Sequence, residues 1–204
     1  MRSDPVVADL LAALPSDRVL LDADAVTPYL RDAATWAEHG RARAVVRARD
    51  TSEVAATVAV CARHRIPLVP RGAGTGLAGG ANAVDGGVVL STDLMREIVE
   101  INAAERLGVV QPGVVNDDLR AAAAERLLWY PPDHRVRGGR SAGRGHVIRS
   151  DRSGRAAVSG EHGVGLLKRA GLRRELDPGA LALHRAVKQA FDPQGILNPG
   201  KKLG

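Results

Sequence analysis

The chain has 204 residues, 45% hydrophobic and 25% charged, which is the composition of a globular protein large enough to bury a core. One cysteine, Cys61, excludes an internal disulfide framework, and no apolar run is long enough to cross a bilayer, so we expect a cytoplasmic protein for which peripheral membrane contact stays open. The net charge of +6 would suggest an acidic partner, but seven arginines and one acid within residues 134–155 account for all of it.

The N-terminal half is expected to contain helices over residues 5–14, 26–36 and 51–65, and strands over residues 41–49 and 66–70. Asp50 can cap the third helix, because Glu53 stands at the capping-box position. The apolar face of this helix would be formed by Val54, Val58 and Cys61, with Ala55 and Ala62 beside them.

A cluster of five glycines follows the strand over residues 66–70: Gly72, Gly74, Gly76, Gly79 and Gly80. We call residues 71–80 the glycine loop. Its letters match the dinucleotide fingerprint G-x-G-x-x-G, but the few residues between the loop and the next strand leave no room for the crossover helix of that fold. A P-loop is excluded as well, because no Gly-Lys-Ser/Thr follows.

Two interpretations of the glycine loop remain. Glycine-rich peptides can point several backbone N–H groups into one concavity and let the main chain approach an anion closely, and Thr75 would add a hydroxyl donor. The other interpretation is a mobile surface loop without a ligand.

The rest of the chain continues the mixed pattern, with strands expected over residues 86–92, 96–102, 106–113 and 127–133. A helix over residues 114–127 would have Asn116 as its N-cap. Residues 134–155 show neither helical nor strand periodicity and are expected to be a flexible connector. A last helix begins with Asp177 as cap and Pro178 at its first position. Its apolar stripe is Leu183, Ala186, Val187, Ala190 and Phe191, and turns end the chain.

The segment VPRGAGTGLAGGA resembles the pyrophosphate loop of the FAD-linked oxidases of the vanillyl-alcohol oxidase/PCMH superfamily, in particular the glycolate oxidase FAD subunit and the D-lactate dehydrogenases. The flanking segments VDGGVVLSTDLMREIVEIN, VQPGVVNDDL and WYPPD agree with that family in order and spacing, and SGEHGVGLLKR through FDPQGILNPGKKL resembles its C-terminal signature. The resemblance covers residues 40–133 and 156–204. It implies an α+β fold: a partial PCMH-type FAD-binding domain followed by the family's C-terminal helix and tail.

The resemblance also assigns roles to residues of this chain. It implies an enzyme that passes hydride from the α-carbon of a 2-hydroxy acid, such as D-lactate or glycolate, to N5 of FAD. His162 matches the base that takes the hydroxyl proton, and Glu161 matches a ligand of the divalent metal in metal-dependent relatives and would orient the hydroxyl. The residues that match FAD contacts are Arg71, Gly72, Gly74, Thr75, Gly76, Gly79, Gly80, Pro132, Asp133 and Asn198.

The chain departs from the family pattern after WYPPD. There the family continues with the remainder of the FAD domain and a substrate-binding cap domain, whereas this chain has the arginine-rich segment. The paired metal-binding histidines, spaced H-x₆-H in relatives, are also missing. We therefore expect an internally truncated member, with unpaired strand edges and uncovered apolar faces, that binds FAD weakly or not at all and lacks turnover.

The resulting domain prediction is an N-terminal helical segment over residues 1–39, a partial FAD-binding domain over 40–133, a basic linker over 134–155 and the C-terminal segment over 156–204. The alternative is a nucleic-acid-binding protein, because the Arg/Gly-rich linker resembles segments that bind RNA or single-stranded DNA. The linker contains no aromatic residue on which bases could stack, so we expect no nucleic-acid partner. The substrate acid, the electron acceptor and the oligomeric state stay open.

Overall fold

The computed structural model describes residues 4–130 and 163–203. The chain divides into two compact units. Unit 1 comprises residues 1–94 and 157–204, and unit 2 comprises residues 95–156. The N-terminal and C-terminal parts of the sequence therefore belong to the same unit.

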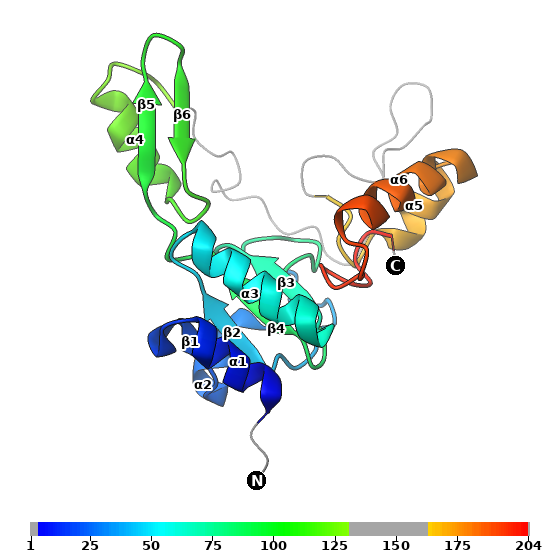
Figure 1. Cartoon of the computed structure of the whole chain (residues 1–204). Helices are drawn as coiled ribbons and strands as arrows, with labels where there is room; N and C mark the ends of the chain where they lie inside the picture. Colours follow the sequence, from blue (N-terminus) through cyan, green and yellow to red (C-terminus); the bar gives the residue numbers. More distant parts are fainter. Residues whose placement is uncertain (1–3, 131–162, 204) are drawn as a thin grey trace. The chain divides into compact units, whose positions relative to one another are not determined.

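Unit 1 is built on a four-stranded sheet in the order β1-β2-β4-β3 (Figure 1). The strands are β1 (Val19–Leu20), β2 (Ala44–Arg47), β3 (Leu68–Arg71) and β4 (Val88–Ser91). β4 lies between β2 and β3 and is parallel to both, whereas β1 pairs with β2 in the antiparallel sense. The strands β2 and β4 are almost wholly buried, as expected for parallel strands covered on both faces.

The described part of unit 1 also contains helices, some of which the sequence predicts, near residues 5–14, 51–65 and from Pro178 onward, and others that it does not. They are α1 (Pro5–Ala13), η1 (Ser16–Arg18), α2 (Ala23–Val26), η2 (Thr27–Tyr29), α3 (Thr51–His64), α5 (Arg169–Glu175) and α6 (Pro178–Phe191). The prediction of one helix over residues 26–36 is wrong beyond η2. Residues 30–36 leave the helical path, because the backbone N–H of Asp32 donates to Asn82 Oδ1 at 2.8 Å.

The helix α3 begins as predicted, with Asp50 Oδ1 accepting from the backbone N–H of Glu53 at 2.9 Å. The residues of α3 that are buried are Thr57, Val60 and Cys61. Of the predicted face only Cys61 is fully buried, so the observed face is rotated about the helix axis by part of a turn. The packing partner decides this, since α3 lies against both α1 and β4. Burial raises the pKa of the Cys61 thiol to about 11, which fits a small core residue rather than a reactive thiol.

Unit 2 contains an antiparallel pair, β5 (Ile98–Asn102) and β6 (Leu107–Val110), and the helix α4 (Asn116–Ala124). Asn116 is the first helical residue and Val115 is the N-cap without a side-chain hydrogen bond, so the predicted cap was one residue late. Residues 127–130 form no strand, which corrects the expected strand in its described part. The expected connector over residues 134–155 lies outside the described residues.

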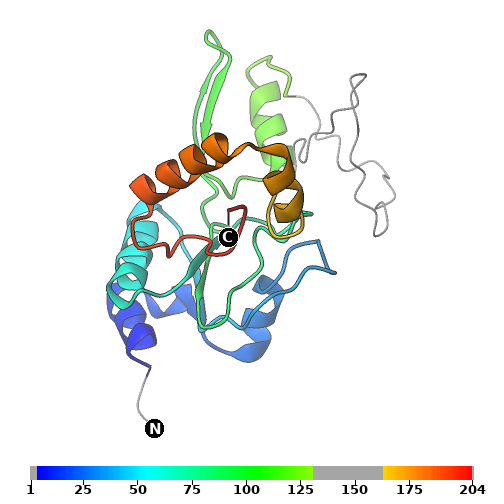
Figure 2. The same cartoon turned by 90° about the vertical axis from the view of Figure 1, so that its right-hand side faces the viewer.

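The C-terminal tail returns to the sheet of unit 1, where Leu197 forms a parallel bridge with Leu68 of β3 (Figure 2). The Leu68 N–H donates to Ile196 O at 2.8 Å, and the Asn198 N–H donates to Leu68 O at 2.9 Å. The carboxylate of Asp192 accepts from the backbone N–H groups of Ile196 and Leu197 and fixes the turn before this bridge. The tail thus protects the free edge of β3, whereas the sequence predicts only turns.

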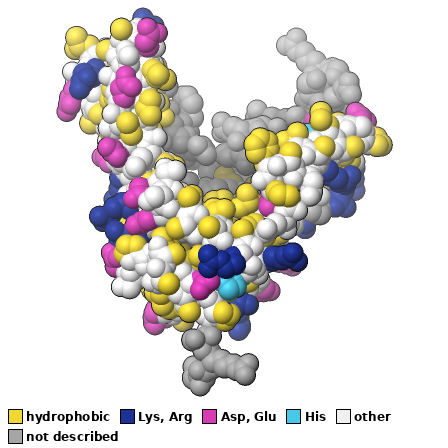
Figure 3. All heavy atoms as spheres, viewed as in Figure 1, with side chains coloured by type: hydrophobic (Ala, Val, Ile, Leu, Met, Phe, Trp, Pro, Cys, Tyr) yellow, Lys and Arg dark blue, Asp and Glu magenta, His cyan; other side chains and the backbone are white. Residues whose placement is uncertain are grey.

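The capped start of α6 is as predicted, with Asp177 accepting from Ala180 N and Pro178 in the first turn. Its apolar stripe is exposed, however, and 84% of the Phe191 surface is accessible. Figure 3 shows hydrophobic side chains on the visible surface of this part of the chain. The exposed stripe agrees with the expectation of uncovered apolar faces. No helix in the described ranges is long and apolar enough to cross a membrane.

Candidate cofactor site

The glycine loop connects β3 directly to β4, and residues 72–87 contain no helix. This geometry excludes the Rossmann crossover, as the short spacing predicts. Gly74 and Gly79 have φ of 77° and 70°, in the left-handed region that favours glycine. Two of the five loop glycines are therefore required by the backbone path itself.

No backbone N–H of residues 72–81 has a hydrogen-bond acceptor among the described residues, and most of residues 72–77 are exposed. Backbone N–H groups that lack a protein acceptor need water or a ligand, and a run of them on a glycine-rich turn is a typical anion site. An added Cβ at Gly72 or at Gly80 would meet no atom of the described residues within 4 Å, so within this part of the chain open space borders the main chain at both positions.

Arg71 lies beneath the loop, where its side chain supports the main chain. The residue is 9% exposed, and its guanidinium donates to Arg31 O at 3.0 Å and stands 5.3 Å from the centroid of the Tyr29 ring. A Cβ on Gly74 would come within 1.9 Å of Arg71 Nη2, so the loop passes directly over the guanidinium. Burial lowers the pKa of this guanidinium, and the nearby charges of Tyr29 and Asp32 oppose the shift.

Asn82 and Asp32 form a buried hydrogen-bonded pair at the C-terminal end of the loop. The Asn82 amide donates to Glu38 O at 2.9 Å and Ala37 O at 3.4 Å, while its Oδ1 accepts from the Asp32 N–H. Asp32 Oδ1 accepts from Ala34 N–H, but Asp32 Oδ2 has no partner among the described residues, although the residue is only 5% exposed. The unpaired carboxylate oxygen would lie 3.2 Å from a Cβ on Gly76, at the inner side of the loop.

The segment that follows residue 162 packs on the glycine loop. Leu166 N–H donates to Ala78 O at 2.8 Å, and Gly165, at φ 51°, is so close that an added Cβ would lie 2.1 Å from that oxygen. Gly79 faces the Leu166 side chain. The C-terminal segment and the loop, far apart in the sequence, therefore form one site within unit 1.

The structure brings together many of the residues that the sequence assigns to the cofactor. The predicted loop contacts, Arg71 to Gly80, lie beside the C-terminal tail, and Asn198 has a buried Oδ1 without a partner among the described residues. The other assigned residues, Pro132, Asp133, Glu161 and His162, lie outside the described residues. Within the described part of the chain, no group of three or more His, Cys, Asp or Glu residues could hold a metal ion.

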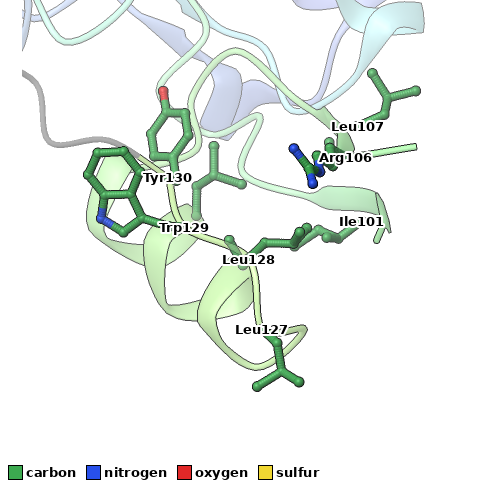
Figure 4. Close-up of a pocket in the computed structure, with 10 residues that line it drawn as sticks. Ile101, Arg106, Leu107, Leu127, Leu128, Trp129 and Tyr130 are labelled. Carbon is green, nitrogen blue, oxygen red and sulfur yellow. The ribbon is translucent and has the colours of Figure 1, made fainter. Parts of the chain in front are cut away.

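Unit 2 carries a separate hollow of about 530 Å³. It is bordered by side chains of β5, β6 and the turn after α4, among them Ile101, Leu107 and Leu128 (Figure 4). The side chains of Leu127 and Trp129 at its rim are 97% and 80% exposed. The lining is mainly aliphatic and aromatic, with Arg106 as its charged member, which is typical of a surface that contacts other protein rather than of a diphosphate site.

Residues 42–159, more than half of the chain, match the family described as FAD binding domain. The chain belongs to this family of FAD-binding domains. Residues 155–202 match the C-terminal domain of the FAD-linked oxidases. The two matched ranges overlap at residues 155–159, so no further segment separates the part matching the FAD-binding domain from the part matching the C-terminal domain.

Three curated relatives illustrate the similarity. Glycolate oxidase subunit GlcD of Bacillus subtilis is 42% identical over 90 residues, 44% of this chain and 19% of the relative. D-2-hydroxyglutarate dehydrogenase of Stutzerimonas stutzeri is 38% identical over 134 residues, 64% of this chain and 28% of the relative. D-lactate dehydrogenase of Anaerostipes hadrus is 33% identical over 129 residues, 63% of this chain and 27% of the relative. The chain thus spans less than a third of the length of each.

Solved structures agree on the fold. A crystal structure of p-cresol methylhydroxylase with substrate bound superposes with a TM-score of 0.54 at 26% identity, over 61% of this chain and 25% of that one. Alkyldihydroxyacetonephosphate synthase gives a TM-score of 0.56 at 16% identity, with the same coverage of 61% and 25%, and supports the fold alone. The PCMH-type fold expected from the resemblance is confirmed.

The residues of the loop fit the diphosphate of FAD. Backbone N–H groups without an acceptor among the described residues, open space beside Gly72 and Gly80, the buried Arg71 and the partly buried Lys201 suit a dianionic group. Sequence reasoning missed Asp32, Asn82 and Lys201 at this site. Asn82 directly follows the loop motif and Lys201 stands within the tail motif, so these motifs could have indicated both residues, whereas the spacing of Asp32 from the loop gives no such signal.

Proposed function

We propose that the glycine loop holds the diphosphate of FAD, and that the chain serves the oxidation of a small 2-hydroxy acid. The observation that carries the proposal is the run of backbone N–H groups over residues 72–81 without acceptors among the described residues. Such a run, next to open space at Gly72 and Gly80, can surround an anion at hydrogen-bond distance. The acid class is supported by the names of relatives, which act on glycolate, D-2-hydroxyglutarate or D-lactate.

The chemistry would be divided between cofactor and protein. When bound, FAD supplies a flavin that takes up the two electrons removed from the substrate. Thr75 and the loop amides would hold the diphosphate, and Asn198 would turn its unpaired Oδ1 toward the cofactor. His162 would take the hydroxyl proton, and Glu161 would orient that hydroxyl or bind a divalent metal. The packing of residues 165 and 166 on the loop supports this assignment, because the two proposed catalytic residues shortly precede them in sequence.

For this chain alone we expect weak FAD binding and no turnover. The chain spans less than a third of each relative described above, and the exposed apolar surfaces of unit 2 and α6 are those that further protein would cover. A purified sample that kept a yellow chromophore through desalting, and was bleached by D-lactate or glycolate, would contradict this expectation.

Alanine at Gly72 and at Gly80 tests the loop directly. Neither residue has positive φ, and each Cβ would occupy open space, so the folded protein without cofactor should be as stable as before. If the diphosphate occupies that space, each methyl group should weaken FAD binding about tenfold, because the main chain can no longer approach the phosphates. Titration of FAD fluorescence, with urea unfolding of the same variants, measures both effects.

Gly108→Ala in β6 is the matched control. It also adds one methyl group to a glycine without positive φ, where the nearest atoms of the described residues would lie 4.0 Å away, but in unit 2, and it should leave FAD affinity unchanged. FAD affinity that stays the same in Gly72→Ala and in Gly80→Ala would refute the loop as the diphosphate site.

A further inference from the structure

Lys201 fastens the C-terminal tail to the glycine loop. Its Nζ donates to Gly80 O at 3.0 Å and also to Asn82 O. The tail is held on both sides of this lysine, since Arg169 donates to Gly200 O at 2.7 Å and the Lys202 N–H donates to Gly165 O at 2.9 Å. The ammonium group is therefore directed at the loop by anchored neighbours and does not sample the solvent freely.

These contacts determine how one loop peptide is oriented. In a planar trans peptide, the C=O of one residue and the N–H of the next point in opposite directions. With Gly80 O bound to Lys201, the N–H of Ala81 must point away from the lysine, and this N–H has no acceptor among the described residues. The second carbonyl bound to Lys201 belongs to Asn82, whose own side chain holds Asp32 in place.

The charge of Lys201 is only partly compensated. No carboxylate of the described residues lies within ion-pair distance of its Nζ. Burial lowers the pKa of this ammonium to about 8, and the charge of Asp32 opposes the shift. Among the described residues, the cations Arg169, which donates to Gly200 O, and Lys202, the next residue in the tail, flank this position. An anion in the loop would therefore stabilise the protonated lysine.

We propose that Lys201 is a positioning residue for the diphosphate site, which orients the Gly80–Ala81 peptide toward the anion and is protonated when the anion is bound. The proposal rests on the proposed function for its ligand, a diphosphate. The arrangement of the loop by Lys201 is testable without any ligand. Two substitutions separate the roles, because Lys201→Met removes both charge and donors, whereas Lys201→Arg keeps a cation that stays protonated over the whole accessible pH range.

The first test measures FAD affinity between pH 7 and pH 9.5 by fluorescence titration. In the wild-type chain Lys201 loses its proton above about pH 8, and since the bound anion favours the protonated form, affinity should fall about tenfold over this range. Lys201→Arg should bind FAD without that fall. Lys201→Met should bind about tenfold more weakly at pH 7 and show no pH dependence of this origin. If the FAD affinity of Lys201→Arg also fell with rising pH, the proposed link between Lys201 protonation and anion binding would be overturned.

The second test uses the protein without FAD. Amide hydrogen exchange reports the Asn82 and Ala83 N–H groups, which donate to Gly79 O and Leu30 O. In Lys201→Met their exchange should rise about tenfold, while Lys201→Arg should restore most of the protection. Unchanged exchange in Lys201→Met would overturn the positioning role. Absence of FAD binding by the wild-type chain at every pH, together with the expected exchange result, would refute the diphosphate site and leave the contact between lysine and loop established.

Discussion

Gly165→Ala is expected to release the C-terminal segment from the glycine loop and to lower the free energy of unfolding of unit 1 by about 3 kcal/mol. The alanine Cβ would lie 2.1 Å from Ala78 O, a backbone atom that cannot move without shifting the loop. The same residue has φ of 51°, which is unfavourable for any side chain. Urea unfolding followed by circular dichroism measures the loss, and FAD affinity should fall with it.

Gly163→Ala is the control for the backbone strain in this prediction. Gly163 has φ of 73°, but a Cβ there would meet no atom of the described residues within 4 Å. Its replacement should therefore lower the free energy of unfolding by only about 1 kcal/mol, because a side chain is unfavourable in the left-handed conformation. Equal losses in the two variants would show that close packing at Gly165 contributes nothing.

Asn82→Ala is expected to destabilise unit 1 by about 3 kcal/mol and to lower the FAD affinity below that of the wild-type chain. The Asn82 side chain is fully buried and bonds to backbone groups of Asp32, Ala37 and Glu38. Its removal leaves these groups without their partner and frees the end of the glycine loop. Thermal unfolding monitored by circular dichroism, with and without FAD, measures both consequences.

Asn102→Ala provides the comparison between the fully buried Asn82 and an asparagine that is only partly buried. The Asn102 Oδ1 accepts from Glu105 N–H at 3.0 Å in an exposed turn, where water can replace the amide. We expect a loss of about 0.5 kcal/mol or less and no change in FAD affinity. If Asn82→Ala were as mild as this variant, the buried pair of Asn82 and Asp32 would not be what shapes the loop.

Local sequence signals predicted the elements well where they act through neighbouring residues. Asp50 and Asp177 cap α3 and α6 as expected, because a capping side chain bonds to an N–H only a few residues away. The helix expected over residues 26–36 failed for the opposite reason, since Asp32 finds its hydrogen-bond partner fifty residues further along the chain. The buried face of α3 also depended on what packs against it, which periodicity alone does not give.

The sequence alone excluded the Rossmann interpretation of the glycine loop, because the distance to β4 is too short for a crossover helix, and it left an anion site and a mobile surface loop as the two alternatives. The resemblance to FAD-linked oxidases added the correct family. Only the tertiary structure decided which groups shape the loop: Arg71 beneath it, Asn82 with Asp32 at its end, and Lys201 from the tail. The physical reason is that a buried polar group bonds to whichever partner the folded chain brings within hydrogen-bond distance. For these residues that partner lies far away in the sequence, so local patterns do not reveal it.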